Sequence, residues 1–598
     1  MNGQRLLFSI ICFAVPLLYF SSCGVDKSPV NFISGHLHWE PANGPYGGKV
    51  NHIVQGPDSR ILAAMDYGGV YLSGNLGESW EYIGLRTVRI VKLFVDSYGV
   101  YWAGSDYGLY SSKDEGENWH RVEQESFGQI YQIYEDSAGG LFIVSIGRLF
   151  YRHERGGIWQ KIEAPESAAI RGVAVGKSGA LFVTTTKGLY RSINSGSSWE
   201  KLPIDIWDSM IAEAGNGNLL LYGASTDGSR IFLSKDDFRT WKQILEISGP
   251  IYNLSLDAEG NYYLGAQEGL YFSDNEGQAW HLLMQECTFG IAPTRQGVLL
   301  AATGDGIVRS ADAGLTWEES NYGLMAFTFN ALAVSPLTGE VYACGPQGLY
   351  CSIDQGESWQ KRSDDYFTGT LAVNIKGFIY AAYGFSYSES LWRSADGGAA
   401  WRDVSPPARV NALAFGPSEF LYTATMNGVY YSPDNGHNWL SAGLQEYDLT
   451  SVAVAGERIL AGWLPDLFYS DDNGRNWVQR DTLSVRQICV NSWGHIFLND
   501  NLRIRRSVDG GKNWKVLYLS PEGKGARIIS LLCAPRGGLM VATHGNGILV
   551  SADDGDHWQV ENEGLPSKYI DVLAMDPNGR VYAGARGGSI YRTRGFTD

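Results

Sequence analysis

Positive charge is scarce in this chain: 47 Lys and Arg residues stand against 64 Asp and Glu residues, and the formal net charge is −17. A protein that binds nucleic acid neutralises phosphates with clustered Lys and Arg side chains. The composition therefore argues against a nucleic-acid partner. The chain also lacks His-Glu-x-x-His, Gly-x-Ser-x-Gly and Gly-x-x-x-x-Gly-Lys-Ser/Thr motifs, so metalloprotease, α/β-hydrolase and P-loop chemistry find no support.

Cysteine is also sparse, with seven residues in 598. Cys12 and Cys23 belong to the N-terminal segment. The other five lie in apolar, strand-like runs, at Cys287, Cys344, Cys351, Cys489 and Cys533. An odd number at scattered positions indicates neither a disulfide framework nor a metal site, so we expect buried thiols, no bound metal and no cofactor.

One long apolar run is present, Leu6 to Phe20, preceded by Arg5. It is short for a membrane span and is typical of an export signal. The run ends in "SSCG", which resembles a bacterial lipoprotein box, although Phe20 stands where Leu is usual. The resemblance implies a signal peptide at 1–23, a lipid on Cys23 as the only membrane attachment, and a polar tether at 24–35. The protein would then lie in the bacterial cell envelope, on the periplasmic or surface side of the outer membrane; an uncleaved anchor helix is the alternative.

Glycine (74 residues) and aromatic residues (13%) are abundant, as in proteins made of short strands and tight turns. The segment "SADAGLTW", Ser310 to Trp317, has relatives along the whole chain. Its tryptophan recurs every 37 to 44 residues, at Trp80, Trp119, Trp159, Trp199, Trp241, Trp280, Trp317, Trp359, Trp401, Trp439, Trp477, Trp514 and Trp558. This period fits four short strands with their turns, which is one blade of a β-propeller.

We call this stretch the repeat segment and expect it in the turn between the third and fourth strands of each blade. Its Asp, such as Asp312, can accept backbone N–H bonds inside the turn, and its Gly, such as Gly314, can adopt a positive φ. Its Trp can wedge between neighbouring blades.

The repeat segment resembles the Asp-box of bacterial neuraminidase repeats, and the resemblance covers nearly all of the mature chain. In that family the box lies on the face opposite the ligand site, which implies structural aspartates and neither catalysis nor calcium binding. The structural aspartates are Asp114, Asp312, Asp354, Asp396, Asp434, Asp472, Asp509 and Asp553; Asn75, Asn194 and Asn275 replace Asp in other copies. A neuraminidase itself is a poor fit, because that family uses one six-bladed ring and an arginine triad.

Fourteen sets of strands divide into two rings of seven, since one ring rarely exceeds eight blades. The prediction is an all-β protein with two seven-bladed propellers of four-stranded blades, over 36–314 and 315–598, in a monomer. We expect the Trp39 strand to complete the blade that contains residues 287–309, and the Trp317 strand to complete the final blade near Tyr591. The alternative sends the Trp39 strand to that final blade.

The stretches "GPYGGKVNHIV" and "AAMDYGGVYLS" resemble the opening of xyloglucanase-type glycoside hydrolases, which are paired seven-bladed propellers. Asp66 matches the catalytic aspartate of that family. The second aspartate, required for inverting hydrolysis, has no counterpart, because "ACGPQGLYCS" places Pro346 and Gln347 there. Asp305 belongs to the wrong ring and Asp466 lies three blades late. The alternative interpretation of Asp66 is a turn residue that caps its own backbone.

Aromatic and acidic residues in turns of the expected ligand face are candidate ligand contacts, because flat aromatic rings beside carboxylates suit sugars and also protein partners. They are Tyr67, Asp106, Tyr107, Phe385, Tyr387, Trp463 and Asp466. Packing between adjacent loops is the alternative for each.

Three functions remain open. The first is a non-catalytic envelope lipoprotein that binds a polysaccharide or an envelope protein. The second is an inverting glycoside hydrolase of the xyloglucanase type. The third is an assembly or scaffolding factor, as implied by a resemblance to sortilin-like propellers and single-propeller photosystem assembly proteins. Fold alone does not choose among them.

Overall fold

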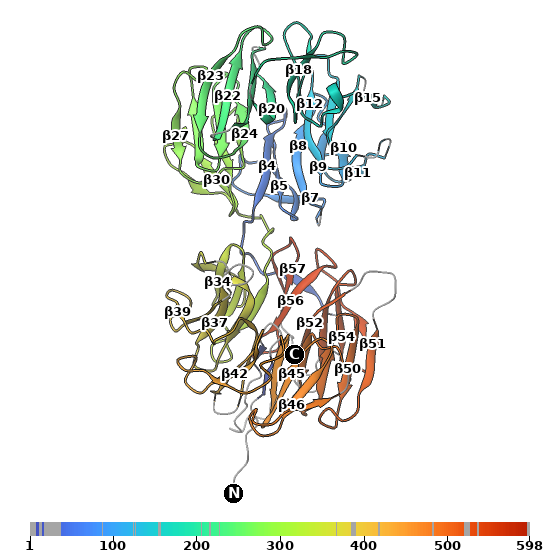
Figure 1. Ribbon diagram of the computed structural model, residues 1–598, viewed down its shortest axis with the longest axis vertical. Coiled ribbons are helices and arrows are strands. Elements are labelled where there is room, and N and C mark those ends of the chain that lie inside the picture. The colour runs from blue at the N-terminus through green and yellow to red at the C-terminus, as the bar shows by residue number, and fades with distance from the viewer. Residues whose placement is uncertain are drawn as a thin grey trace. The chain divides into compact units, whose positions relative to one another are not determined.

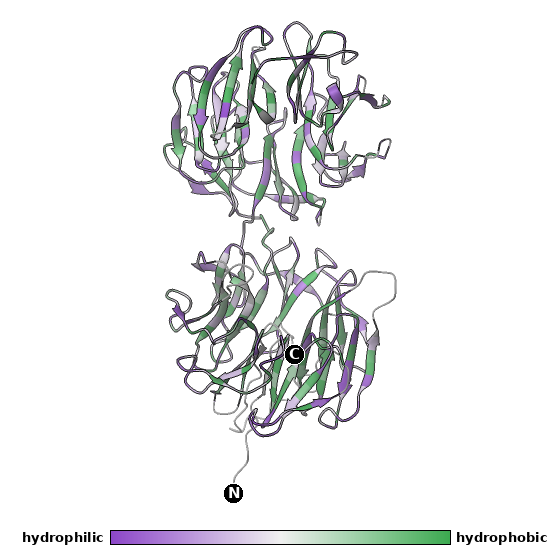
Figure 2. Ribbon diagram, viewed as in Figure 1, coloured by the Kyte–Doolittle hydropathy of each residue, from purple (hydrophilic) through white to green (hydrophobic). Residues whose placement is uncertain are grey.

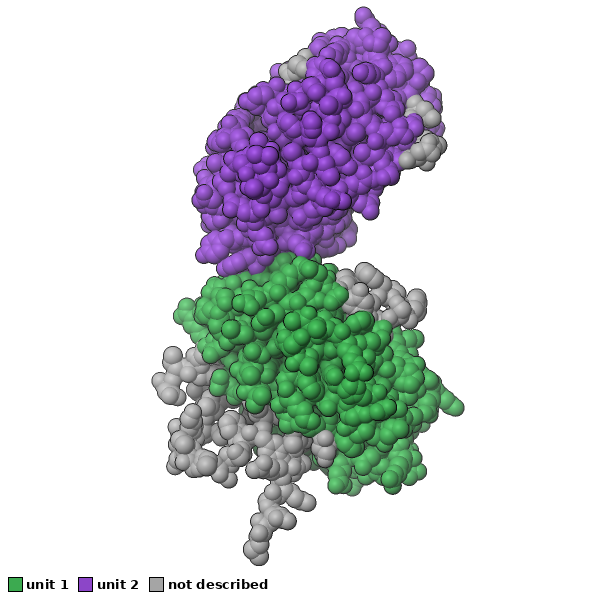
Figure 3. Space-filling view, turned by 90° about the vertical axis from the view of Figure 1, so that its left-hand side faces the viewer, with its two compact units in different colours: residues 1–45, 327–598 green, residues 46–326 purple. Residues whose placement is uncertain are grey.

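The computed structural model describes residues 8–10, 15–16 and 37–594, except 87, 124, 126, 154–156, 205, 215–216, 226–227, 366, 384–389, 417–418, 481–482, 520–526 and 535–537. Within these residues the protein is all-β, with the 3₁₀ turn η1 (Pro165–Ser167) and no α-helix. The chain forms two compact units, drawn in different colours in Figure 3. We call residues 46–326 the inserted propeller, and residues 37–45 with 327–594 the split propeller.

The inserted propeller consists of seven four-stranded antiparallel sheets, the blue to green part of Figure 1. In chain order they are β4 (Val50–Gln55), β5 (Ile61–Met65), β6 (Gly69–Ser73) and β7 (Glu81–Gly84); β8 (Ile90–Val95), β9 (Tyr101–Ser105), β10 (Gly108–Ser112) and β11 (His120–Arg121); β12 (Ile130–Glu135), β13 (Leu141–Ser145), β14 (Arg148–Arg152) and β15 (Gln160–Ile162); β16 (Ile170–Val175), β17 (Leu181–Thr185), β18 (Gly188–Ser192) and β19 (Glu200–Lys201); β20 (Trp207–Glu213), β21 (Leu219–Ser225), β22 (Gly228–Ser234) and β23 (Lys242–Ile247); β24 (Ile251–Leu256), β25 (Tyr262–Ala266), β26 (Gly269–Ser273) and β27 (His281–Met284); β28 (Gly290–Pro293), β29 (Leu299–Ala302), β30 (Ile307–Ser310) and β31 (Glu318–Glu319).

The split propeller also has seven blades, the yellow to red part of Figure 1. They are β32 (Ala331–Val334), β33 (Val341–Gly345), β34 (Gly348–Ser352) and β35 (Gln360–Ser363); β36 (Phe367–Val373), β37 (Ile379–Tyr383), β38 (Ser390–Ser394) and β39 (Arg402–Asp403); β40 (Val410–Phe415), β41 (Leu421–Thr425), β42 (Gly428–Ser432) and β43 (Leu440–Ser441); β44 (Ser451–Ala455), β45 (Arg458–Gly462), β46 (Leu467–Ser470) and β47 (Val478–Arg480), extended by β1 (Phe8–Ile10) and β2 (Val15–Pro16); β48 (Gln487–Val490), β49 (Ile496–Asn499), β50 (Arg503–Ser507) and β51 (Lys515–Leu519); β52 (Arg527–Cys533), β53 (Leu539–His544), β54 (Ile548–Ser551) and β55 (Gln559–Val560); and β56 (Ile570–Met575), β57 (Val581–Ala585) and β58 (Ile590–Thr593) with β3 (Trp39–Pro41).

Both rings are closed. In the inserted propeller β4 packs against β8 on one side and against β28 on the other, and in the split propeller β32 packs against β36 and β56. Closure removes the open sheet edges that would otherwise pair with other chains. The predicted fold class, two seven-bladed propellers of four-stranded blades, is confirmed.

Hydrophobic cores fill the spaces between adjacent blades. The second strand of a blade, such as β5 or β9, is buried along its whole length because blades cover both of its faces. Between the first two blades, Leu62 and Ala64 pack with Ile90, Leu93 and Tyr101. This arrangement explains the nearly continuous apolar runs of the inner strands, which are green in Figure 2.

The preferred closure scheme is wrong. Trp39 pairs with Thr593 of β58, and the strand that follows Trp317, β31, pairs with its sequence neighbour β30. A short turn lets β31 form a local hairpin, which leaves the final blade one strand short, and β3 completes it. The units therefore divide at 45/46 and 326/327, and not as 36–314 and 315–598.

The repeat segment forms the turn between the third and fourth strands. In the copy that begins at Ser432, the Ser432 hydroxyl donates to Asp434 Oδ1 at 2.8 Å and accepts from Gly436 N at 2.7 Å. Asp434 Oδ1 accepts a further bond from the backbone N–H of Asn438 at 2.8 Å. Gly436 has a φ of 88°, and an added Cβ would meet Val404 Cβ at 2.8 Å, so only glycine fits. The Trp439 indole donates to Val404 O of the preceding blade at 2.8 Å.

Every predicted structural aspartate accepts the backbone N–H of the residue four positions later. Asn75, Asn194 and Asn275 accept the same bond through Oδ1. Either an Asp or an Asn side chain therefore supplies the oxygen acceptor of the turn. Hydrogen bonds from Thr316 and Ser310 lower the pKa of Asp312 from 3.8 to about 2.

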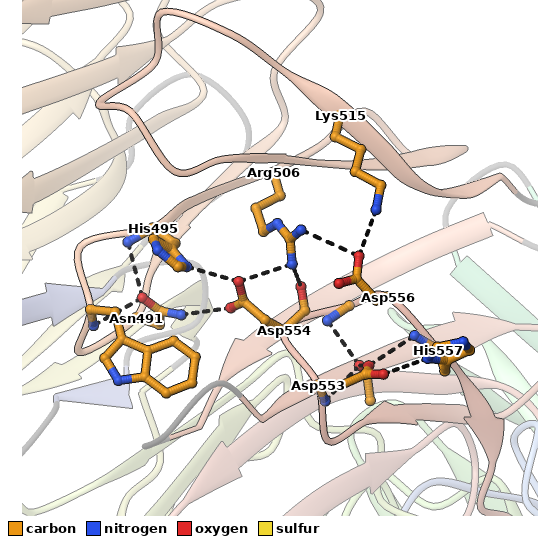
Figure 4. Close-up of polar contacts among 11 residues, drawn as sticks. Asn491, His495, Arg506, Lys515, Asp553, Asp554, Asp556 and His557 are labelled. Atoms are coloured by element: carbon orange, nitrogen blue, oxygen red, sulfur yellow. Dashed lines mark hydrogen bonds and ion pairs between the residues drawn. The ribbon is translucent and has the colours of Figure 1, made fainter.

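The residue after the segment's Asp adds a bond between blades. Asp554 is 8% exposed and has a positive φ of 61°. Its carboxylate accepts from Asn491 and His495 of the preceding blade, both at 2.8 Å, and from Arg506 at 3.0 Å (Figure 4). In other copies Glu115, Asp237, Glu276 and Asn435 bond to Arg60, Lys177, Asn218 and Asn374 of the preceding blade.

The expectation of free thiols holds for Cys344 and Cys351, which are buried, and Cys287 is free and partly exposed. It is wrong for Cys489 and Cys533, which form a disulfide. These residues lie 44 positions apart, on the first strands of adjacent blades, β48 and β52. Residues one repeat period apart occupy equivalent positions of adjacent blades and therefore lie side by side. Cysteines that are far apart in the sequence can pair for this reason.

The acceptor role of the repeat segment predicts different effects of two substitutions at Asp312. At pH 7, Asp312→Asn should lower the Tm less than Asp312→Ala does, because Asn keeps the oxygen acceptor although it lacks the charge. The folded pKa lies below the unfolded value, so the charge stabilises the fold above about pH 4 and this contribution is lost as the pH falls toward 2. Asp312→Asn should therefore lose less Tm than wild type over that range in calorimetry. An Asn variant as unstable at pH 7 as the Ala variant would contradict the acceptor role.

The disulfide predicts a labelling pattern in denatured, unreduced protein. Cys287, Cys344 and Cys351 should be alkylated by iodoacetamide, and Cys489 and Cys533 should be alkylated only after reduction, as read by peptide mass spectrometry. In Cys489→Ala, Cys533 should become reactive without reduction. Labelling of Cys533 in unreduced wild-type protein would contradict the pairing.

Candidate functional site

Blade topology separates two faces of each propeller. In a four-stranded antiparallel meander, the turns after the first and third strands lie at one end, and the turn after the second strand lies at the other end with the connection to the next blade. We call these ends the segment face, which carries the repeat segments, and the loop face. Asp66, Tyr67, Asp106 and Tyr107 follow second strands, β5 and β9, and therefore lie on the loop face of the inserted propeller.

Asp66 belongs to a polar network. Its Oδ1 accepts from Arg89 Nε at 2.8 Å and from Asn51 Nδ2 at 3.1 Å. Its own N–H donates to Lys49 O at 2.8 Å, which fixes the turn against the strand connection that precedes β4. The side chain is 27% exposed. Asp66 thus combines a turn role with a carboxylate engaged by a cation.

Asp106 shares that cation. Arg89 Nη1 lies 3.2 Å from Asp106 Oδ2, so one guanidinium joins the turns of the first two blades. Burial alone would lower the pKa of the Arg89 guanidinium, but hydrogen bonds and charges of the two aspartates raise it overall. Tyr67 and Tyr107 follow the two aspartates and are 43% and 71% exposed. The structure therefore joins Asp66 and Asp106 through Arg89, with Tyr67 and Tyr107 next to them in the same turns. Arg89 was not among the residues predicted from the sequence.

An aromatic and cationic cluster continues this surface toward the last blades. Lys49 Nζ lies 4.7 Å from the centroid of the Phe289 ring, and the Phe289 and Tyr252 ring centroids are 5.1 Å apart. Tyr252 is 37% exposed. Contacts thus run from Tyr252 through Phe289 and Lys49 to the Asp66 network. The sequence does not reveal this cluster, because its residues come from strand connections that are far apart in the chain.

The predicted ligand residues of the split propeller do not form such a surface. Trp463 packs edge-on against Tyr447, with ring centroids 5.1 Å apart, and lies against a hydrophobic core. Asp466 is 6% exposed, so its predicted projection toward a ligand is wrong; the turn is closed by Trp463 N donating to Asp466 O at 2.8 Å. Phe385 and Tyr387 lie outside the described residues, as do Cys23 and the tether.

The loop face of the split propeller carries a charged cluster that the sequence did not indicate. Asp571 Oδ1 lies 2.7 Å from His544 Nε2 and 2.8 Å from Arg586 Nη2. His544 ends β53, Asp571 lies in β56, and Arg586 follows β57. The turn in which the resemblance would require a second catalytic aspartate holds Pro346 and Gln347, between β33 and β34.

The arrangement of the Asp66 network differs from the carboxylate pair of an inverting glycosidase. A general acid in an inverting glycosidase must deliver a proton, and a second carboxylate must activate water some 6.5 to 9.5 Å away. Here Asp66 and Asp106 are both acceptors to one arginine. Exposed tyrosine rings beside fixed charges match the surfaces that bind sugars. Over the described part of the chain, no group of three or more His, Cys, Asp and Glu side chains could hold a metal ion.

Comparison with known proteins identifies shared architecture. No protein-family model matches the chain, and no curated protein does. Among solved structures, the GH74 xyloglucanase from Xanthomonas campestris is 18% identical, with a TM-score of 0.74 over 93% of this chain and 99% of that one. The GH74 enzyme of Niastella koreensis is 14% identical, with a TM-score of 0.70 over 94% and 100%.

A further solved structure is PorZ, an essential bacterial surface component of the type-IX secretion system of Porphyromonas gingivalis. It is 13% identical, with a TM-score of 0.61 over 94% of this chain and 86% of that one. The expected resemblance to xyloglucanase-type propellers is therefore confirmed for the fold. At these identities the likeness does not extend to activity.

Without the Arg89 guanidinium, the carboxylates of Asp66 and Asp106 should repel each other. Arg89→Met should lower the free energy of unfolding in urea by about 1 kcal/mol, the upper end for a partly exposed ion pair. In an Asp66→Asn, Asp106→Asn background the same substitution should cost little, which a double-mutant cycle measures. Arg121→Met is the matched control, since Arg121 donates to Tyr107 O and, among the described residues, forms no ion pair. Equal costs in both backgrounds would contradict the network.

Proposed function

We propose that this chain is a non-catalytic polysaccharide-binding lipoprotein of the bacterial cell envelope, and that it binds its ligand on the loop face of the inserted propeller. The observation that carries the proposal is the Asp66 network. The residue that matches the catalytic aspartate of xyloglucanases is engaged by Arg89 and Asn51, and the position of its expected partner holds Gln347.

The form of the face supports binding. Tyr67 and Tyr107 present exposed rings beside the charged network, and Tyr252 extends the aromatic surface. Aromatic rings contribute binding area with little loss of side-chain entropy, and fixed charges orient hydroxyl groups through hydrogen bonds. On the segment face, by contrast, the aspartates of the repeat segments accept hydrogen bonds within their own turns.

Two observations support the envelope location. The N-terminal "SSCG" sequence resembles a lipoprotein box, and a double propeller of similar fold, PorZ, is a bacterial surface component. In the part of the chain that the structure describes, no helix has the length and apolar character needed to cross a membrane. The lipid on Cys23 would then supply the attachment.

A second candidate function is an inverting glycoside hydrolase. The specific observation in its favour is the fold likeness to GH74 enzymes over more than 90% of the chain, together with the Asp66 turn. A scaffolding role, with an envelope protein as the ligand of the same face, is the third.

The test is retention and cleavage of polysaccharides by the mature protein. On xyloglucan, mixed-linkage β-glucan and bacterial polysaccharides we expect retardation in affinity electrophoresis and no released oligosaccharides. Tyr67→Ala and Tyr107→Ala should each weaken retention about fivefold, as expected for aromatic contacts worth about 1 kcal/mol. Tyr98→Ala is the control, because Tyr98 is 60% exposed in a turn of the segment face.

Other outcomes separate the three functions. Release of oligosaccharides that Asp66→Asn abolishes would establish the hydrolase and contradict the proposal. Neither retention nor cleavage, with co-purification of an envelope protein that Tyr107→Ala prevents, would favour the scaffold.

A further inference from the structure

The central channel of the inserted propeller contains a cavity of about 610 Å³, lined by the first strands of six blades. It is separate from the Asp66 network, whose residues do not line it. Apolar residues, including Ile53, Leu93, Ile133 and Ile211, share its wall with polar and charged ones. Polar and charged side chains in such a wall are costly unless something compensates them, which makes each of them informative.

A repeated irregularity places equivalent residues at one level of the channel. In six blades the pairing of the first and second strands shifts register after the first residue, and the residues just past the shift are His52, Lys92, Gln132, Gly172, Ser209 and Asn253. His52, Lys92, Gln132 and Asn253 line the cavity. They form a polar ring at one level of the channel.

Lys92 is the cation of this ring, and among the described residues no acid forms an ion pair with it. Burial lowers the pKa of its ammonium group to about 8. The neighbouring His52 accepts a long bond from Leu93 N at Nδ1 (3.4 Å), and burial together with the Lys92 charge holds its pKa well below the usual range. Neutral His52 therefore carries its proton on Nε2 and is a further donor.

Gln132 does not compensate Lys92. Its amide oxygen accepts from Val173 N at 2.7 Å, and its amide nitrogen donates to Val173 O at 3.1 Å. Both groups are thus engaged by the neighbouring strand, which carries Gly172. The acids that line the cavity, Glu213 and Asp257, lie four residues beyond Ser209 and Asn253 on their strands, about 13 Å along an extended chain. Arg295 lies at that same end of the channel, beyond β28, and donates to Pro57 O.

The fold does not require this cation. Three first strands of the split propeller carry the same register shift, and the residues just past it are Ala412, Ser530 and Val572. Small or apolar residues thus occupy the equivalent positions in the split propeller. A lysine that costs desolvation energy and has no acidic partner is what a site for an anionic ligand would contain.

We propose that the central channel of the inserted propeller binds a small oxyanion, a phosphate or the carboxylate of a sugar acid, through Lys92 with His52 and Asn253 as further hydrogen-bond donors. The cavity has room for a monosaccharide. The formal charge of −17 disfavours general adsorption of anions, so binding requires a built site. This inference does not depend on the proposed polysaccharide face.

The test is isothermal titration calorimetry of the mature protein at pH 7 with inorganic phosphate, D-glucuronate and neutral D-glucose. We expect saturable binding of phosphate or glucuronate and none of glucose, and whichever anion binds identifies the source. Lys92→Met should weaken that binding at least tenfold. Lys113→Met, a change of the same charge at an exposed site on the segment face, should leave it unchanged.

A second measurement needs no variant. Binding to wild type should weaken as the pH rises from about 8 to about 10, because Lys92 loses its charge while glucuronate and the phosphate dianion keep theirs. Of the other groups that face the cavity, Tyr134 and Tyr222 have pKa values raised to about 12 and His52 is neutral throughout. The other charged groups that face the cavity are Glu213, Asp257 and Arg295. No binding of either anion, binding equal in Lys92→Met, or binding insensitive to this pH change would overturn the proposal.

Discussion

The structure depends on one hydrogen-bonded turn, in which a serine hydroxyl and an aspartate or asparagine oxygen together hold the backbone between the third and fourth strands of a blade. The glycine that follows permits close packing of the preceding blade, and the tryptophan at the end of the segment spans the gap between blades. The Trp439 indole, for example, donates to the carbonyl of Val404 in the preceding blade. The turn is thereby tied to the neighbouring blade of the propeller. Repetition of this unit makes a closed ring from blades that would be unstable alone.

Because the aspartates of the turns bond within their own segments, we place the proposed ligand contacts at the other end of the blades. On the loop face of the inserted propeller, Arg89 joins two aspartates and two exposed tyrosines flank the pair. The resemblance of the Asp66 turn to that of a catalytic family is genuine as sequence, but the surrounding contacts differ from those that acid catalysis requires. A carboxylate engaged by two donors is suited to fixing the shape and charge of a binding surface.

The features that recur in every blade could be predicted from the sequence. Tryptophan spacing predicted fourteen blades in two rings, and the pattern of Ser310 to Trp317 predicted the bonds of the turn. It did not determine the closing strand, because the Trp39 and Trp317 strands carry the same signal and only the local hairpin of β31 with β30 separates them. Asp466 was misjudged for a related reason: a position in a turn does not report whether neighbouring loops cover it. Arg89, Phe289 and the Cys489–Cys533 bridge were missed because their partners are neighbours around a ring and not along the chain.

Hydrogen–deuterium exchange with and without a retained polysaccharide tests the central claim most directly, because it reports which face the ligand covers. The account predicts slower exchange at 47–51, 66–69, 105–108 and 287–290, on the loop face of the inserted propeller, and unchanged exchange in the repeat segments at 73–80 and 112–119. Protection concentrated in the repeat segments, or confined to the split propeller, would contradict it.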